Sequence, residues 1–264
     1  MRSASIGKDL PYYIYLPPGY SDTQTTRRYP VVYLLSGLGG NYKEWAYENI
    51  NLCTQMDGWV LNDKYQPMIV VMPTGREDSD QPGCDARFPG LGAYWFNHPP
   101  PPVSDGKRWS DFVWNDLVNA VDASYRTIPS RTSRAVGGLS AGANGALSDA
   151  LNHPDVFAFV ASHSASFRRA DGTLQCFGTQ EYFNQYDPIW LVQNKQTWRQ
   201  LSIWMDDGDR DQEWGQANRD FRNLLLALGI PHEWHELYGD HVPPYWAANV
   251  KLYMQWYSSN LRGQ

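Results

Sequence analysis

Strand-like and helix-like segments alternate along this 264-residue chain, and the alternation constrains the fold more than any other feature. Short runs rich in Val, Ile, Leu and Met are typical of strands, and apolar residues near a helical period mark the segments between them. The expected strands are residues 12–16, 29–35, 68–72, 135–139, 156–162, 201–205 and 232–238. The expected helices are residues 111–125, 141–152, 218–228 and 247–260. This order predicts an α/β fold, with a mostly parallel central sheet and helices on both faces.

Two long stretches, residues 74–110 and 164–200, interrupt the alternation. Structureless segments of that length are uncommon in compact domains and usually have a function. Ligands of parallel sheets bind outside the carboxyl ends of the strands. We therefore expect a single domain over residues 1–264, in which both stretches form loops that cover a cleft at that edge of the sheet.

Composition and charge argue against several classes of partner. The formal net charge is −6 and there is no Lys/Arg-rich run, so we expect no binding to nucleic acid or to anionic membrane surfaces. No apolar run approaches the roughly 18 residues of a membrane span, and the first ten residues lack the apolar core of a signal peptide. The expected chain is soluble, either cytoplasmic or secreted after removal of a signal. The sequence gives no indication of the oligomeric state.

The three cysteines, Cys53, Cys84 and Cys176, are widely spaced and form no C-x-x-C motif, which argues against a zinc cluster or a dithiol redox site. The segment from His232 to His235 is one residue short of H-E-x-x-H and falls in an expected strand, so it predicts no zinc site either. A disulfide between Cys84 and Cys176 is an alternative, but three free thiols in a reducing compartment is the favoured interpretation. We expect neither a metal nor an organic cofactor.

The segment Gly138-Leu139-Ser140-Ala141-Gly142 matches G-x-S-x-G at a junction between an expected strand and an expected helix. A serine on such a tight turn stands above the sheet, and the turn requires small neighbours. The helix N-terminus behind the serine adds positive potential where an oxyanion would form. The motif therefore predicts Ser140 as a nucleophile; a close-packed turn without catalytic function is the alternative.

A serine hydroxyl needs a base, and in this arrangement the chain order is serine, acid, histidine. His241 follows the last expected strand, where it could reach Ser140, whereas the other histidines precede the acid candidates or lie within an expected strand. The acid should follow the strand at 201–205. The four candidates are Asp206, Asp207, Asp209 and Asp211. The residues alone do not separate these four, and the three that are not the acid would be solvated turn charges.

An oxyanion hole requires two backbone N–H groups. One should belong to Ala141, directly after the nucleophile, and the other to the glycine-rich segment at residues 36–40. The expected substrate pocket includes Gly37, Trp95 and Trp246. Trp95 and Trp109 in the 74–110 stretch would suit an aryl or hydrophobic acyl group, although packing within the loop is the favoured explanation of these side chains.

Together these residues resemble the putative-esterase family of α/β hydrolases, which includes esterase D (S-formylglutathione hydrolase), feruloyl esterases and mycolyltransferases. The resemblance covers about residues 10–261. Its motifs are residues 15–20 (YLPPGY), 32–40 (VYLLSGLGG), 69–73 (IVVMP), 138–142 (GLSAG), 153–157 (HPDVF) and 239–241 (GDH). It implies the α/β-hydrolase fold and Leu38 as the second oxyanion donor. Because the family places its acid three residues after a glycine, it implies Asp211, after Gly208.

Two positions depart from the family pattern. Ser36 stands where the family often has histidine, and Ala141 stands where it favours methionine. The oxyanion donors are backbone groups, so we expect the chemistry to survive. The smaller Ala141 side chain removes bulk near the acyl group.

The resemblance and the residues together predict a serine carboxylic-ester hydrolase that forms an acyl-enzyme on a small-molecule ester, such as a feruloyl, other aryl or short acyl ester. Ser140 would attack the ester carbonyl, His241 would be the base, and Asp211 would orient it. The alternatives are acyl transfer to an alcohol or sugar acceptor, peptide hydrolysis, and a non-catalytic binding module on the same fold.

Overall fold

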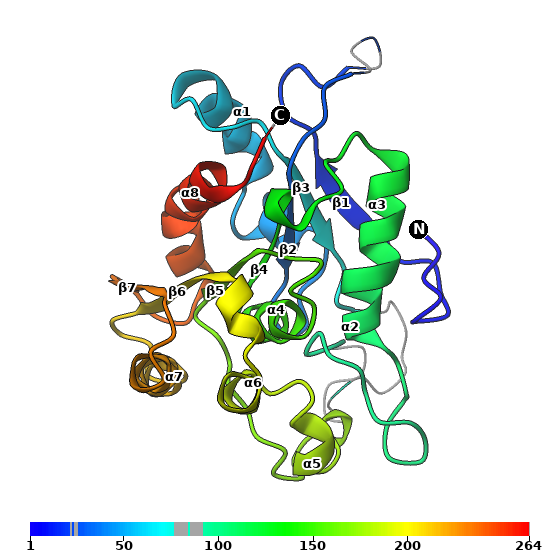
Figure 1. Ribbon diagram of the computed structural model, residues 1–264, viewed down its shortest axis with the longest axis vertical. Helices are drawn as coiled ribbons and strands as arrows, with labels where there is room; N and C mark the ends of the chain where they lie inside the picture. The colour runs from blue at the N-terminus through cyan, green and yellow to red at the C-terminus, as the bar shows by residue number, and fades with distance from the viewer. Residues whose placement is uncertain (22, 24–25, 77–83, 85–91, 264) are drawn as a thin grey trace.

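A seven-stranded sheet lies at the centre of the computed structural model, which describes residues 1–21, 23, 26–76, 84 and 92–263 (Figure 1). The strand order is β1-β3-β2-β4-β5-β6-β7. The strands are β1 (Tyr12–Tyr15), β2 (Val31–Leu35), β3 (Ile69–Pro73), β4 (Arg134–Leu139), β5 (Phe159–His163), β6 (Ser202–Gly208) and β7 (Glu233–Leu237). β1 pairs antiparallel with β3, and every other neighbouring pair is parallel. The mostly parallel sheet predicted from the alternation is confirmed.

Burial explains why the central strands are almost continuous apolar runs. Every residue of β2, β3 and β4 is buried, because helices cover both faces of the sheet there. The edge strand β7 instead carries polar residues and is only half-buried.

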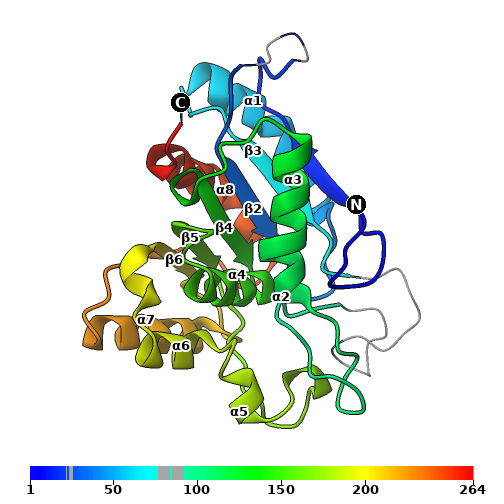
Figure 2. The same cartoon turned by 45° about the vertical axis from the view of Figure 1, so that its right-hand side comes forward.

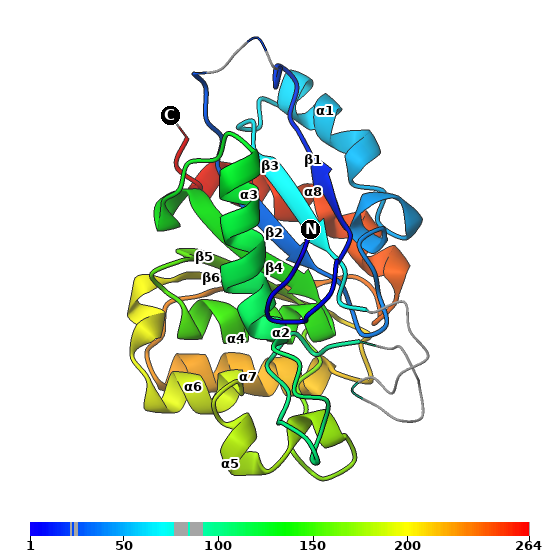
Figure 3. The same cartoon turned by 90° about the vertical axis from the view of Figure 1, so that its right-hand side faces the viewer.

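Helices cover both faces of the sheet (Figures 2 and 3). The α-helices are α1 (Cys53–Asn62), α2 (Trp109–Asp111), α3 (Val118–Ser124), α4 (Ala141–Asn152), α5 (Gln180–Phe183), α6 (Pro188–Asn194), α7 (Gly215–Ala227) and α8 (Pro243–Asn260). The shorter helical turns are η1 (Glu44–Glu48), η2 (Phe112–Leu117), η3 (Arg131–Ser133), η4 (Gln175–Phe177) and η5 (Thr197–Gln200). Apolar residues of α1 and α8 share one core cluster, and those of α3, α4 and α7 share another. None of the helices in the described part of the chain has the length and apolar character that a membrane span requires.

The structure corrects the expectation that residues 164–200 form a loop. This stretch carries η4, α5, α6 and η5, and α6 lies beside α4 (Figure 2). The start of α6 has recognisable signals, since Asp187 caps it and Pro188 occupies its first turn, but seven residues are too few to show a helical period. Helix α1 was also missed, because it buries only Met56 and Trp59 and so shows little periodicity. In the other stretch, residues 77–83 and 85–91 lie outside the described residues.

The favoured interpretation of three free thiols is wrong for two of the cysteines. Cys84 and Cys176 form a disulfide across 92 residues of sequence, which connects the two long stretches. Both are buried in one apolar cluster, and their spacing in the sequence gave no sign of this proximity. A ring nitrogen of His98 lies within 4.8 Å of both sulfurs, a spacing that could suit a metal ion. The two sulfurs are joined to each other in the disulfide, so they are not free thiolate ligands. Cys53 is a free, half-buried thiol.

Candidate active site

Ser140 occupies the turn between β4 and α4 in a backbone conformation that only a tightly packed site maintains. Its φ is 54° and its ψ is −117°, a region that costs free energy for any residue with a side chain. A Cβ on Gly138 would lie 2.4 Å from the carbonyl carbon of Gly142, and one on Gly142 would lie 2.3 Å from the carbonyl oxygen of Leu35. The two glycines of the motif are therefore required by the close approach of backbone to backbone.

His241 lies between β7 and α8 and contacts both other residues of the predicted triad. Its Nε2 is 2.9 Å from the Ser140 Oγ, and its Nδ1 is 2.9 Å from the Asp211 Oδ2. The His241 side chain is 11% exposed and that of Asp211 is fully buried. In this geometry Nδ1–H donates to the carboxylate, which leaves Nε2 to accept the serine proton. The structure thus brings the three predicted triad residues together, with His241 between Ser140 and Asp211.

The Asp211 carboxylate is held by several donors. Its Oδ1 accepts hydrogen bonds from the backbone N–H groups of Glu213 and Trp214, at 3.0 and 2.7 Å. Burial alone would raise the pKa of Asp211, but the hydrogen bonds from His241 and from the Trp214 N–H outweigh burial and hold the pKa well below its usual range. Asp211 is therefore ionised whenever His241 could act as a base.

The expectation that the remaining aspartates are solvated turn charges is wrong for two of them. Strand β6 continues to Gly208 rather than ending at residue 205, so Asp206 and Asp207 lie inside the strand and are fully buried. Only Asp209 is exposed, where it accepts a hydrogen bond from the Gly239 N–H.

Asp206 has a structural role that separates it from the triad. It accepts hydrogen bonds from the hydroxyls of Tyr245 and Tyr253 on α8, and from the indole N–H of Trp204. It also lies 2.5 Å from the Nδ1 of His163, at the end of β5. These contacts join β5, β6 and α8, and none of them is to Ser140, Asp211 or His241.

The glycine-rich segment after β2 lies directly beside the nucleophile. A Cβ on Gly37 would lie 3.7 Å from the Ser140 Cβ. The N–H of Gly37 donates to the Glu44 carboxylate at 2.8 Å, and burial raises the pKa of Glu44. Among the described residues, neither the N–H of Leu38 nor that of Ala141 donates a hydrogen bond. Glu44, on η1, is a supporting residue that sequence reasoning missed, because nothing in its local sequence marks it.

The three expected pocket residues have different environments. Trp95 has no exposed surface; it belongs to the core, where its indole N–H donates to the Ser36 carbonyl at 2.8 Å. The expectation that Trp95 lines the pocket is therefore corrected, since its ring fills the space left by nearby glycines. Trp246 lies edge-on to His241, with ring centroids 5.0 Å apart. Gly37 lies beside Ser140, as described above.

An arginine that sequence reasoning missed lies close to this edge of the sheet. The Arg168 guanidinium packs 5.0 Å from the ring centre of Trp214 and donates to the Tyr94 hydroxyl. The Trp214 ring lies 6.5 Å from that of His241. The described surroundings of the triad thus include the aromatic rings of Trp214 and Trp246 and the Arg168 guanidinium.

Comparison with known proteins identifies the family. The model of the putative-esterase family matches residues 3–252. Esterase Rv1288 of Mycobacterium tuberculosis is 27% identical over 275 residues, covering 91% of this chain and 54% of that protein, so the chain spans about half the length of this relative. An endo-1,4-beta-xylanase/feruloyl esterase of Xylanibacter ruminicola is 27% identical over 159 residues, covering 60% of this chain and 20% of that protein.

A solved structure of a ferulic acid esterase superposes with a TM-score of 0.83 at 22% identity, covering 99% of this chain and 96% of that one. At that identity the superposition shows the fold, which is the α/β-hydrolase fold that the sequence motifs implied. The family match covers all seven strands of the sheet and includes Ser140, Asp211 and His241. The chain belongs to the putative-esterase family.

Proposed function

We propose that this protein hydrolyses carboxylic esters through an acyl-enzyme on Ser140. The observation that carries the proposal is the continuous set of hydrogen bonds from the Ser140 Oγ through His241 to Asp211. Ser140 attacks the ester carbonyl while the His241 Nε2 accepts its proton and then gives that proton to the leaving alcohol. Asp211 holds the required tautomer and stabilises the imidazolium that forms.

The oxyanion of the tetrahedral intermediate is bound by the backbone N–H groups of Leu38 and Ala141. Glu44 supports this role, because its hydrogen bond to the Gly37 N–H fixes the loop that carries Leu38. The N-terminus of α4 adds positive potential at the same place. Water then attacks the acyl-enzyme with His241 again as base, which releases the acid and restores Ser140.

The proposed substrates are small-molecule esters of aryl or short acyl groups, with hydroxycinnamate esters as the leading class. Two features support this choice. The half-buried Trp214 lies close to the His241 ring, where an aryl acyl group could pack; Trp246 also lies beside His241 but is only 5% exposed. A relative and a structural neighbour are a feruloyl esterase and a ferulic acid esterase.

A panel of p-nitrophenyl esters of rising chain length, measured beside methyl ferulate, tests the proposal. Ser140→Ala should keep the fold and lower kcat by about a million-fold, as in other serine triads. A fluorophosphonate probe should label the wild-type protein and not the variant. Labelling of another serine would overturn the assignment of Ser140. Product analysis with and without an added alcohol separates hydrolysis from acyl transfer.

A further inference from the structure

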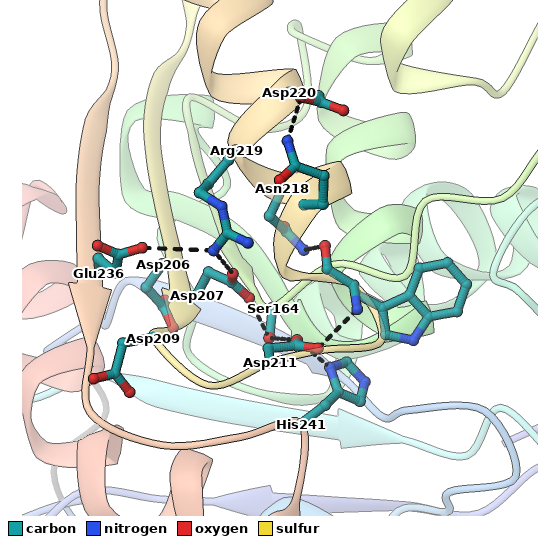
Figure 4. A network of polar contacts seen from close by, with 12 residues as sticks. Ser164, Asp206, Asp207, Asp209, Asp211, Asn218, Arg219, Asp220, Glu236 and His241 are labelled. Atoms are coloured by element: carbon teal, nitrogen blue, oxygen red, sulfur yellow. Dashed lines mark hydrogen bonds and ion pairs between the residues drawn. The ribbon is translucent and has the colours of Figure 1, made fainter.

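A second buried carboxylate lies directly behind the triad acid. Asp207, near the end of β6, and Asp211 lie on opposite sides of the Ser164 hydroxyl, which follows β5 (Figure 4). The Ser164 Oγ is 2.9 Å from the Asp207 Oδ1 and 2.9 Å from the Asp211 Oδ2. Ser164 and Asp207 are fully buried, and so is the side chain of Asp211. Bulk solvent therefore does not reach the Ser164 hydroxyl or the two carboxyl groups, which depend on neighbouring groups for their hydrogen bonds.

The number of protons determines how these contacts work. A serine hydroxyl has one proton to donate, and ionised carboxylates only accept. Both contacts can be hydrogen bonds only if one carboxyl group keeps its proton and donates it to the Ser164 Oγ. Asp211 is the ionised member, because it already accepts from His241 and from two backbone N–H groups. The protonated member is therefore Asp207.

The surroundings of Asp207 agree with a neutral carboxyl group. Among the described residues, no hydrogen bond reaches its buried Oδ2. An ionised oxygen in that position would carry a large desolvation cost, which a neutral group avoids. Burial, together with the nearby charge of Asp211, raises the pKa of Asp207 to about 7.

Other charged and titratable groups face Asp207 from three elements. Arg219 of α7 lies 3.7 Å from Oδ2, but it is 36% exposed and shares its guanidinium with Glu236 of β7 at 3.5 Å. From α8, Tyr245 is close enough for Asp207 to contribute to the raised pKa of its hydroxyl. The shared and partly solvated arginine does not fully compensate a charge on Asp207, so this group titrates near neutrality.

The backbone around Ser164 is held so that its hydroxyl points between the two carboxyl groups. Ser164 has a φ of 55°, an uncommon conformation for a residue other than glycine. Its N–H donates to the Asp206 carbonyl at 2.9 Å. The next residue, Ala165, exchanges two hydrogen bonds with the Asn218 side chain, at 3.1 and 2.9 Å.

We propose that Ser164 and Asp207 are positioning residues for the triad: neutral Asp207 donates to the Ser164 hydroxyl, which donates to the Asp211 carboxylate. This arrangement orients Asp211 toward His241 and leaves a single negative charge behind the imidazole. Loss of the Asp207 proton leaves one hydroxyl proton between two anions, so Asp211 loses part of its support. The inference rests on the proposed function, because it assigns a role to groups behind the base of that reaction.

The variants Asp207→Asn and Asp207→Ala show whether a hydrogen-bond donor to the Ser164 Oγ is needed at position 207, or only a side chain that fills the space. The asparagine amide still donates to the Ser164 Oγ but cannot ionise, whereas alanine removes the donor. We expect kcat/KM of the wild-type protein to be bell-shaped in pH, with an alkaline limb near pH 7 to 8. Asp207→Asn should lack that limb and stay level up to pH 9. Below pH 7 it should keep at least about a third of the wild-type kcat/KM, while Asp207→Ala should lose about 10- to 100-fold, as expected for a hydrogen bond to a charged group.

The same pH series, measured as the rate of fluorophosphonate labelling of Ser140, makes the test independent of the substrate. If Ser140 is labelled but no ester is cleaved, the proposed function fails while the labelling rates still decide the role of Asp207. An alkaline limb that persists in Asp207→Asn, or a wild-type profile without one, overturns the proposal. Should Asp207→Ala not fold, the wild-type and asparagine profiles decide alone. The exposed Asp209→Asn serves as a matched control and should reproduce the wild-type profile.

Discussion

The two sides of the candidate active site are built from different chemical groups, backbone on one side and side chains on the other. On the nucleophile side, after β2 and β4, backbone groups form the site. Gly138 and Gly142 allow two segments of main chain to lie so close together that a Cβ at either position would clash. On the acid–base side, after β5, β6 and β7, side chains form the site through hydrogen bonds among Ser164, Asp211 and His241. The nucleophile side depends on glycines, which contribute only backbone atoms. The acid–base side depends on which side chains the sheet brings together.

This difference determines what kind of change each side tolerates. A backbone-built turn fails when any side chain is added, because close packing leaves no space. A side-chain network fails when one donor or acceptor is removed, because its buried partners are left unsatisfied. The three predictions below test the division, from the largest expected effect on rate to the smallest.

Neutralising Asp211 should have the largest effect of the three. Asp211→Asn cannot enforce the Nδ1–H tautomer of His241 or stabilise its imidazolium, so we expect kcat to fall by about 10⁴. Asp209 is exposed and its carboxylate accepts a hydrogen bond from the Gly239 N–H, which an asparagine oxygen can also accept, so Asp209→Asn should keep most of the activity. The measurement is kcat for each variant, with folding checked by circular dichroism. If Asp209→Asn were the crippled variant instead, the acid would have been placed wrongly.

The same division explains how much of the molecule could be predicted from its sequence. The sequence predicts the seven strands because buried strands are apolar runs bounded by turns. It predicts the turn at Ser140 because glycine is nearly irreplaceable where two backbone segments touch. Both signals are local. The fold class and the position of Ser140 therefore follow from short segments read alone.

The acid–base side could not be derived in this way. Asp206, Asp207 and Asp211 occur within six positions, and their different roles depend on where β6 ends and on what α8 and β5 place against it. Family resemblance, not local pattern, indicated Asp211. The Cys84–Cys176 disulfide was misjudged for the same reason, since its partners are far apart in sequence.

Glu44 tests whether the backbone-built side also needs a supporting side chain. Glu44→Ala removes the acceptor of the Gly37 N–H, so the loop that carries the Leu38 N–H should lose its fixed position. We expect kcat to fall about 10- to 100-fold, with a smaller change in KM, because the oxyanion is stabilised mainly in the transition state. Glu44→Gln, which keeps an acceptor oxygen, should recover much of the loss. Glu48→Ala, an exposed change on the same helical turn, is the control and should leave kcat unchanged.

Asp206 should show the smallest effect on rate and a clear effect on stability. Its carboxylate accepts hydrogen bonds from Trp204, Tyr245 and Tyr253, none of which contacts the reacting atoms. Asparagine has one acceptor oxygen where aspartate has two, so Asp206→Asn leaves at least one buried donor without a partner. Each such loss costs about 1–3 kcal/mol. Denaturant unfolding should therefore show that the free energy of unfolding falls by about 2–4 kcal/mol. The folded variant should keep kcat within about threefold of the wild-type value, a difference in activation free energy below about 1 kcal/mol. Asp211→Asn, by contrast, should lose rate by the roughly 10⁴ given above, whatever it costs in stability. If Asp206→Asn instead lost rate as steeply as Asp211→Asn while remaining folded, the buried aspartates would act as one catalytic unit, and the separation between structural and catalytic carboxylates at the end of β6 would be wrong.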